Sequence, residues 1–462
     1  MRAFKAFSLF LTLYYPLAGF SSPLSEKIEV FIQEKLPTAQ VGIAIESPQS
    51  GDIIYHRQAD QLYYPASSTK LFSAAAALKE LGPSFQFKTL LLKDEKNIYL
   101  KFTGDPTLTE NNLLTLVSKL KTEKPSVLNQ DIIIDDSTFS GPYYGLGWTW
   151  DSLPWYYSAP VSAIIVNENK TILKILEGKK LGEKLQLQYD ATLPKFTLKT
   201  NVVGVSKTAA DKECQLHLTQ KQSNLTLDGC WPIERTPASL SISIEDPKTM
   251  AKEAIETALK QNHIPFEGKI LFAKANPKAT LIATHDSPPL SEILKSALAD
   301  SNNLTADAIT KTLGLARRNE GSFLQGAHAI QIVLNEAFDF PADQYELFDG
   351  SGMSRYNLIS PSLITELLYR MYHDPLFSVF HKAMSHAGKN GTLADRMKEA
   401  PLVGRIVAKT GSAKGTSALS GYLKANSGKI YIFSIVINQS LDKSANLKMI
   451  EDQFCEMLYN SL

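Results

Sequence analysis

A long β-rich block interrupts the middle of this chain, and it restricts how the rest can fold. Between residues 85 and 275, short strand patterns alternate with turns, as in ILKILEGKKLGEKLQLQYD and LPKFTLKTNVVGVSK. The segments on either side each have too few elements for a core of their own, so we expect them to fold together. We therefore predict one discontinuous domain from residues 23–84 and 276–462, with residues 85–275 inserted as two small domains.

Both ends of this discontinuous part contain helix and strand patterns. Residues 25–36 and 445–458 place apolar side chains at helical spacing, and residues 40–57 have the pattern of two strands around a turn. RIVAKTG, SALSGYLKA and KIYIFSIVIN are three more strand candidates. These elements predict an α/β (α+β) fold, in which an antiparallel sheet is flanked by helices.

The N-terminal residues differ in composition from the rest. Arg2 and Lys5 precede an apolar run from Ala6 to Phe20, and small residues follow it. This is the layout of a cleaved secretory signal, so we predict that residues 1–22 are a signal peptide, with an uncleaved anchor as the alternative. No later stretch is long and apolar enough to span a bilayer. The mature protein is expected to be exported to the periplasm or cell envelope, without an integral membrane span.

Charge and cysteine content bear on nucleic-acid binding, disulfide formation and metal binding. A formal net charge of +1 gives no signal for a polyanion, so a nucleic-acid partner is not expected. Cys214 and Cys230 lie in a strand-like region where a hairpin could join them in a disulfide, whereas Cys455 falls on the apolar side of a predicted helix. The 3 cysteines have no CxxC spacing and the 8 histidines are scattered, so we predict no metal site and no cofactor.

The stretch YPASSTKLFSAAAALKELGP raises the first question of chemistry. It places Ser67 three residues before Lys70 at the start of an alanine-rich helix, a spacing that puts both side chains on one face. A lysine kept neutral there could accept the serine proton, and free N–H groups at the helix N-terminus would favour an anionic intermediate. Ser68 lacks this spacing, which favours Ser67. Alone, the pattern favours a capping serine and a surface lysine.

Two further patterns favour the catalytic interpretation of Ser67 and Lys70. In SNNLTADAITKTLG, Ser301 and Asn303 occupy a turn before an apolar helix, where an N-cap serine is the simple alternative. In RIVAKTGSAKG, Lys409-Thr410-Gly411 ends an apolar strand, where a lysine is usually just exposed. Three such patterns in this order on matching elements rarely coincide by chance.

These three motifs resemble the signature of penicillin-binding proteins and serine β-lactamases. More than two hundred residues separate the first motif from the second, a distance that favours the class C low-molecular-mass penicillin-binding proteins, the D-alanyl-D-alanine carboxypeptidase/endopeptidases. The resemblance covers nearly the whole mature chain and implies a penicillin-recognising, serine transpeptidase-like domain with a large β-rich insertion. It also includes the segments FTGDPTLT, WTWDSLPWYYSAPVSAIIVNEN, HDSPPLSEILK, DGSGMSRYNLISP and GTLADRM.

The resemblance implies a catalytic role for five motif residues. Ser67 would attack the carbonyl of the penultimate D-alanine, with Lys70 as the base that receives its proton. Ser301 would relay that proton toward the leaving amine. Asn303 would hold the substrate amide, and Lys409 would supply positive charge near Ser301.

Substrate binding follows from the same resemblance. Thr410 and Ser412 would bind the terminal carboxylate, and the backbone N–H groups of Ser67 and Ser412 would form the oxyanion hole. Gly411 would let the peptide lie close against the strand edge. Water would then hydrolyse the acyl-enzyme.

Two outlying segments also match positions of this family. Met353 and Arg355 match a loop that lines the substrate groove, where a turn with one exposed arginine is the alternative. Asp151 resembles an acidic position that meets the amine of a diaminopimelate side chain, where a simple turn former is the alternative.

The predicted function is that of a serine DD-peptidase, a hydrolase that cleaves D-Ala-D-Ala termini or D-Ala-diaminopimelate cross-links of peptidoglycan. Its partners would be stem peptides as substrates and β-lactams as covalent inhibitors. A serine β-lactamase and a non-catalytic peptidoglycan-binding protein are the alternatives. The sequence offers no clear separate base for hydrolysing a penicilloyl ester, so we expect a long-lived penicillin adduct on Ser67.

Overall fold

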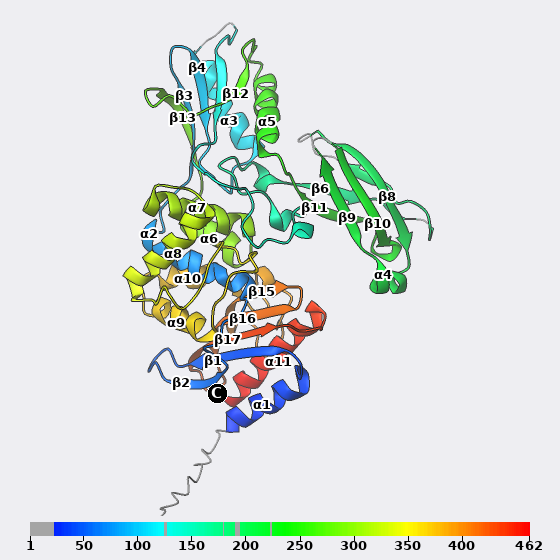
Figure 1. Ribbon diagram of the computed structural model, residues 1–462, viewed down its shortest axis with the longest axis vertical. Helices are drawn as coiled ribbons and strands as arrows, with labels where there is room; N and C mark the ends of the chain where they lie inside the picture. The colour runs from blue at the N-terminus through cyan, green and yellow to red at the C-terminus, as the bar shows by residue number, and fades with distance from the viewer. Residues whose placement is uncertain (1–22, 124–126, 179, 190–194, 222–223) are drawn as a thin grey trace, which may run out of the picture.

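The computed structural model shows a body of helices and one sheet, from which a long insertion extends (Figure 1). Both ends of the described chain lie in the same helix-and-sheet body, and the inserted sheets extend from the opposite side of it (Figure 1). The predicted signal peptide, residues 1–22, lies outside the described residues. No helix within the described ranges is long and apolar enough to span a membrane. These ranges are 23–123, 127–178, 180–189, 195–221 and 224–462.

The central sheet of the body is assembled from the two ends of the chain. Its six strands follow the order β14-β15-β16-β17-β1-β2, and all neighbours are antiparallel. This sheet confirms the predicted fold class. Its strands are β1 (Gln40–Glu46), β2 (Ile53–Arg57), β14 (Ser385–His386), β15 (Ile406–Ala413), β16 (Thr416–Lys424) and β17 (Ile430–Asn438).

Helices cover both faces of the central sheet (Figure 1). On one face, α1 (Pro23–Lys35) and α11 (Ser444–Ser461) pack against alternate side chains of β17, such as Phe433. On the other face, Ile432 belongs to a second core shared with the larger helical layer. Because alternate residues of a strand point to opposite faces, a strand covered on both sides must be apolar almost throughout, as β17 is.

The larger helical layer contains the helix that follows Ser67. This helix, α2 (Lys70–Glu80), has buried alanines from Ala74 to Ala77, whose small side chains let neighbouring helices approach closely. It begins later than the sequence predicted, since a 3₁₀ turn at Ala66–Thr69 precedes it. The other helices of the layer are α6 (Leu290–Leu298), α7 (Asn303–Arg318), α8 (Phe323–Phe338), α9 (Pro361–Tyr372) and α10 (Phe377–Ala383).

The first inserted unit is a five-stranded sheet in the order β12-β5-β4-β3-β13. Helices α3 (Glu110–Ser118) and α5 (Pro247–Gln261) pack against it in a separate core. Since β13 pairs with β3, the sheet continues past residue 275, and the domain bounds given above stay a prediction. Its strands are β3 (Lys88–Lys93), β4 (Asn97–Lys101), β5 (Asp131–Asp135), β12 (Ile270–Phe272) and β13 (Thr280–Asp286).

The second inserted unit contains two three-stranded sheets, in the orders β8-β10-β9 and β11-β6-β7, which share a hydrophobic core. A disulfide joins Cys214, at the end of α4 (Lys207–Glu213), to Cys230 in β10. Cys455 is buried on α11. The strands are β6 (Lys170–Ile175), β7 (Leu187–Tyr189), β8 (Thr197–Val205), β9 (Leu216–Lys221), β10 (Asn224–Pro232) and β11 (Ala238–Ser243).

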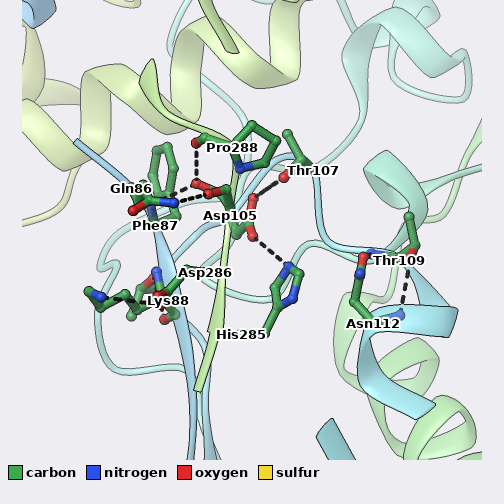
Figure 2. A network of polar contacts seen from close by, with 12 residues as sticks. Gln86, Phe87, Lys88, Asp105, Thr107, Thr109, Asn112, His285, Asp286 and Pro288 are labelled. Carbon is green, nitrogen blue, oxygen red and sulfur yellow. Dashed lines mark hydrogen bonds and ion pairs between the residues drawn. The ribbon is translucent and has the colours of Figure 1, made fainter. Parts of the chain in front are cut away.

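A polar network lies where the chain passes from the body into the insertion and where it returns (Figure 2). The buried carboxylate of Asp105 accepts hydrogen bonds from the backbone N–H and hydroxyl of Thr107, at 2.8 and 2.7 Å, and lies 3.6 Å from His285 Nε2. At the same junction, Ser287 Oγ accepts the N–H of Phe87 at 2.9 Å. Since His285 and Ser287 leave the insertion where Phe87 enters it, these contacts fix both crossings together.

Candidate active site

Ser67 lies in the 3₁₀ turn that leads into α2, at the wall of a cleft with a volume of about 530 Å³. Its side chain is partly exposed, whereas Ser68 and Lys70 are buried. The preceding residue, Ala66, has φ of +46°, a conformation that costs free energy for a residue with a Cβ and that recurs at functional sites. The turn therefore presents Ser67 to the cleft and turns Ser68 into the core.

Lys70 reaches Ser67 from inside the protein. Its Nζ lies 2.9 Å from Ser67 Oγ, and it donates at 2.6 Å each to Asn303 Oδ1 and the carbonyl oxygen of Ser351. A neutral amine has two N–H donors and one lone pair, so two acceptors use the donors and the lone pair is left facing the serine hydroxyl. The geometry therefore fits Lys70 as the acceptor of the Ser67 proton.

The environment of Lys70 favours that neutral form. Burial lowers the pKa of Lys70 to about 8, although the nearby carboxylates of Asp307 and Asp349 act to raise it. Burial also raises the pKa of the Asp307 carboxyl to about 8. The main cause of both pKa shifts is the cost of holding a charge away from water, and the charge of Asp349 adds to the shift at Asp307.

The second and third motifs meet beside the cleft. Lys409 Nζ donates to Ser301 Oγ at 2.8 Å, and Asn303 Nδ2 donates to the carbonyl of Tyr157 at 2.7 Å. Burial, with the charge of Lys70 as a second cause, lowers the pKa of Lys409 well below its usual value. The structure thus forms two hydrogen-bonded groups at one cleft, Ser67 with Lys70 and Asn303, and Ser301 with Lys409.

The strand end expected for the third motif was wrong, and the alternative of an N-cap serine for the second motif was wrong as well. Lys409 does not end its strand: β15 continues to Ala413, because residues 411–413 still pair with β16, and the lysine is fully buried. The helix cap is Asn302, whose side chain accepts the N–H of Thr305 at 2.9 Å. Ser301 instead has φ of +60°, which frees its hydroxyl from capping and leaves it facing Lys409.

The rest of β15 borders the cleft. Thr410 and Ser412 line it, and the hydroxyl of Thr410 donates to that of Thr392 at 2.8 Å. A Cβ added to Gly411 would come within 2.8 Å of the Pro65 carbonyl. Gly411 is thus required for close packing against the turn that carries Ser67, a reason additional to the expected approach of the substrate.

The outlying candidates also line the cleft. Asp151 lies in the short 3₁₀ turn Trp150–Ser152, and its side chain is exposed. Met353 and Arg355 come from the loop after α8, and the guanidinium of Arg355 lies 4.6 Å from the centre of the Tyr64 ring. A cation over an aromatic face is held in place, so Arg355 is more than a free arginine in a turn.

Sequence reasoning missed the carboxylates behind Lys70. Asp307 Oδ1 accepts the N–H groups of Gly350 and Ser351, at 2.9 and 3.0 Å, and so fixes the carbonyl that Lys70 contacts. Asp349 accepts from Trp148 Nε1 at 2.8 Å. A signal for Asp307 was present, since it follows Asn303 by one helical turn on the same face of α7.

The pH dependence of catalysis tests this arrangement. We expect kcat/KM for D-alanine release to rise with pH through a pKa near 8, because the protonated amine of Lys70 cannot accept the Ser67 proton. Replacing Asp307 by asparagine removes a carboxylate that raises the pKa of Lys70, while the amide oxygen can keep both backbone hydrogen bonds. This rise should therefore move to lower pH in Asp307→Asn. A rise that stays in place or moves to higher pH contradicts the assignment.

Among the described residues, no group of three or more histidine, cysteine, aspartate or glutamate side chains could hold a metal ion. The polar groups at this cleft include the hydroxyls of Ser67 and Ser301, beside the amines of two buried lysines.

Comparisons with known proteins agree with this geometry. The model of the D-Ala-D-Ala carboxypeptidase 3 (S13) family matches residues 24–460. The chain is 30% identical to D-alanyl-D-alanine carboxypeptidase DacB of Haemophilus influenzae, over 100% of this chain and 99% of that protein. It is 27% identical to the D-alanyl-D-alanine carboxypeptidase of an Actinomadura species, over 90% of this chain and 81% of that protein.

The fold is likewise similar to a solved structure. The crystal structure of penicillin-binding protein 4 from Haemophilus influenzae matches with a TM-score of 0.84 and 28% identity, covering 94% of this chain and 99% of that one. A second crystal structure of that protein, which matches with a TM-score of 0.78, is complexed with a β-lactam.

Proposed function

The chain belongs to the D-Ala-D-Ala carboxypeptidase 3 (S13) family, and we propose that Ser67 is the nucleophile of its peptidase reaction. It is a serine-type D-Ala-D-Ala carboxypeptidase that acts on peptidoglycan peptides and is acylated by β-lactams. One observation supports the assignment of Ser67 above all: Nζ of a buried lysine lies 2.9 Å from Ser67 Oγ, and its other two contacts are acceptors.

In the first step, Ser67 Oγ bonds to the carbonyl carbon of the penultimate D-alanine while its proton passes to Lys70 Nζ. The backbone N–H groups of Ser67 and Ser412 stabilise the oxyanion that forms. Thr410 and Ser412 bind the terminal carboxylate, which lies on the side of the cleft formed by β15.

In the second step, the C–N bond breaks and the terminal D-alanine leaves as an amine. Ser301 relays to that amine the proton that Lys70 took up, and its own hydroxyl accepts a hydrogen bond from Lys409. Asn303 holds the substrate amide and also accepts from Lys70, so it orients the substrate against the base. Water then attacks the ester carbonyl, which releases the shortened peptide and restores the Ser67 hydroxyl.

The outlying residues extend the site toward the rest of the stem peptide. Asp151, exposed in the same cleft, is suited to the side-chain amine of diaminopimelate. Met353 and Arg355 form part of the groove wall, with Arg355 held over Tyr64. We place this activity in the periplasm after removal of residues 1–22, and the Cys214–Cys230 disulfide fits an oxidising compartment.

Digestion of defined muropeptides tests the proposed function and measures the balance between carboxypeptidase and endopeptidase activity. The purified protein should release D-alanine from a monomeric pentapeptide muropeptide, and a cross-linked dimer in the same assay measures endopeptidase activity. Chromatography of the products against time gives both rates. Absence of D-alanine release by the native protein between about pH 7 and pH 9 would favour a non-catalytic wall-binding protein.

A further inference from the structure

A second and larger cavity adjoins the cleft of Ser67. Its volume is about 820 Å³, and it lies between the segment Trp150–Tyr157 and the inserted strands β9 and β10. Asp151 and Tyr157 line both cavities, so the two spaces meet at these residues. A long substrate in the cleft that passes Asp151 and Tyr157 therefore enters the second cavity.

Aromatic side chains form much of the apolar lining of this groove. Trp150 is 85% exposed, so its indole is available to a ligand. Trp155 and Trp231 are half-buried and pack against the core of the inserted sheets. A rigid aromatic ring at the edge of a groove offers a face for the apolar side of a sugar ring or a peptide at small entropic cost.

The polar lining combines uncharged and charged side chains, and the charged ones are Asp151, Asp211, Arg235 and Glu245. Gln215, His217, Thr219 and Gln220, on and beside β9, contribute amide, imidazole and hydroxyl groups. Such groups both donate and accept hydrogen bonds. They can bond the hydroxyl and acetamido groups of an N-acetylated sugar.

The proposed catalytic roles give the substrate a direction. The terminal carboxylate lies at Thr410 and Ser412, the scissile carbonyl at Ser67, and the diaminopimelate amine at Asp151. The N-terminal part of the stem is joined to the residue whose side-chain amine is placed at Asp151, and Asp151 borders the second cavity. In peptidoglycan, that end of the stem is joined to an N-acetylated amino sugar of the glycan strand.

We propose that the groove between Trp150 and β9 binds the N-terminal part of the stem peptide and the amino sugar attached to it. This inference rests on the proposed function and deepens it by naming the part of the substrate that the insertion recognises. Contacts this far from the scissile bond add binding energy only for substrates that reach them. The insertion then makes the enzyme prefer sugar-linked stems over free short peptides.

A comparison of two substrates in the Trp150→Ala variant tests this proposal. We expect kcat/KM for a disaccharide-pentapeptide to fall about tenfold, the effect of losing one stacking aromatic ring. For a sugar-free tripeptide that ends in D-Ala-D-Ala, kcat/KM should stay within about twofold of the native value, because that peptide does not extend to Trp150. Leu281→Ala is the matched control, since Leu281 is 59% exposed on β13 of the other inserted sheet.

The outcomes separate this proposal from the proposed function. An equal loss on both substrates in Trp150→Ala, or no loss on either, overturns the groove assignment while the peptidase activity stands. Failure of the native protein to release D-alanine from either substrate overturns the proposed function, and the groove assignment with it. A loss on the disaccharide-pentapeptide in Leu281→Ala as large as in Trp150→Ala also contradicts the groove.

Discussion

Replacing Ser67 by alanine is expected to abolish D-alanine release, with kcat/KM falling by at least about 10⁴-fold. The variant keeps the cleft but has no atom that can form the acyl-enzyme. Because Ser67 is partly exposed and Lys70 retains its contacts with Asn303 and Ser351, the midpoint of thermal unfolding should stay close to that of the native protein. Release of D-alanine from a pentapeptide, measured beside a thermal melt, gives both quantities.

Ser68→Ala is the matched control for this variant. Ser68 is the neighbouring serine, but it is fully buried, and its hydroxyl has no hydrogen-bond partner among the described residues. Its loss should leave kcat/KM within about threefold of the native value, since no polar contact is broken. An active Ser67→Ala together with an inactive Ser68→Ala would overturn the choice between the two serines.

Replacing Lys70 by methionine is expected to lower kcat/KM by about 10²- to 10⁴-fold, the usual worth of a general base. Methionine has nearly the volume of the lysine stem, so this change removes the amine with little change in packing. The loss should appear in the rate of acylation by penicillin as well as in D-alanine release. Stopped-flow or quenched acylation kinetics measure that step directly.

A second buried lysine provides the control for Lys70. Burial lowers the pKa of Lys311 to about 8 as well, but its Nζ donates to the carbonyls of Pro142 and Val161, outside the cleft. Lys311→Met should lower the melting temperature, because two buried acceptors lose their donor. Its acylation rate per folded molecule should stay near that of the native protein. A Lys70→Met variant that is acylated as fast as Lys311→Met would contradict the base assignment.

Periodicity predicted the architecture of the body well, because its elements are long and strongly patterned. The helices expected at residues 25–36 and 445–458 correspond to α1 and α11, and the three strand candidates near the C-terminal end are β15, β16 and β17. Their apolar residues alternate between two cores, which is the arrangement that a sheet covered on both faces requires.

Local details of the site were less predictable, because the deciding contacts come from distant residues. Nothing near Lys70 in sequence indicates that Asn303 and Ser351 satisfy its donors, since those partners lie 233 and 281 positions away. The sequence pattern predicts that the strand of Lys409 ends at Gly411, yet pairing with β16 continues it to Ala413. The three motifs could therefore be named from the sequence, but their burial and hydrogen bonds needed the fold.

Covalent labelling of the native protein tests the central claim most directly. After incubation with a labelled penicillin, the protein should carry one adduct whose mass equals that of the intact antibiotic, because ring opening leaves no fragment. Proteolysis and mass spectrometry should place it on Ser67, and it should persist well beyond the time of mixing. An adduct on any other residue, or rapid penicillin turnover without an adduct, would contradict the account.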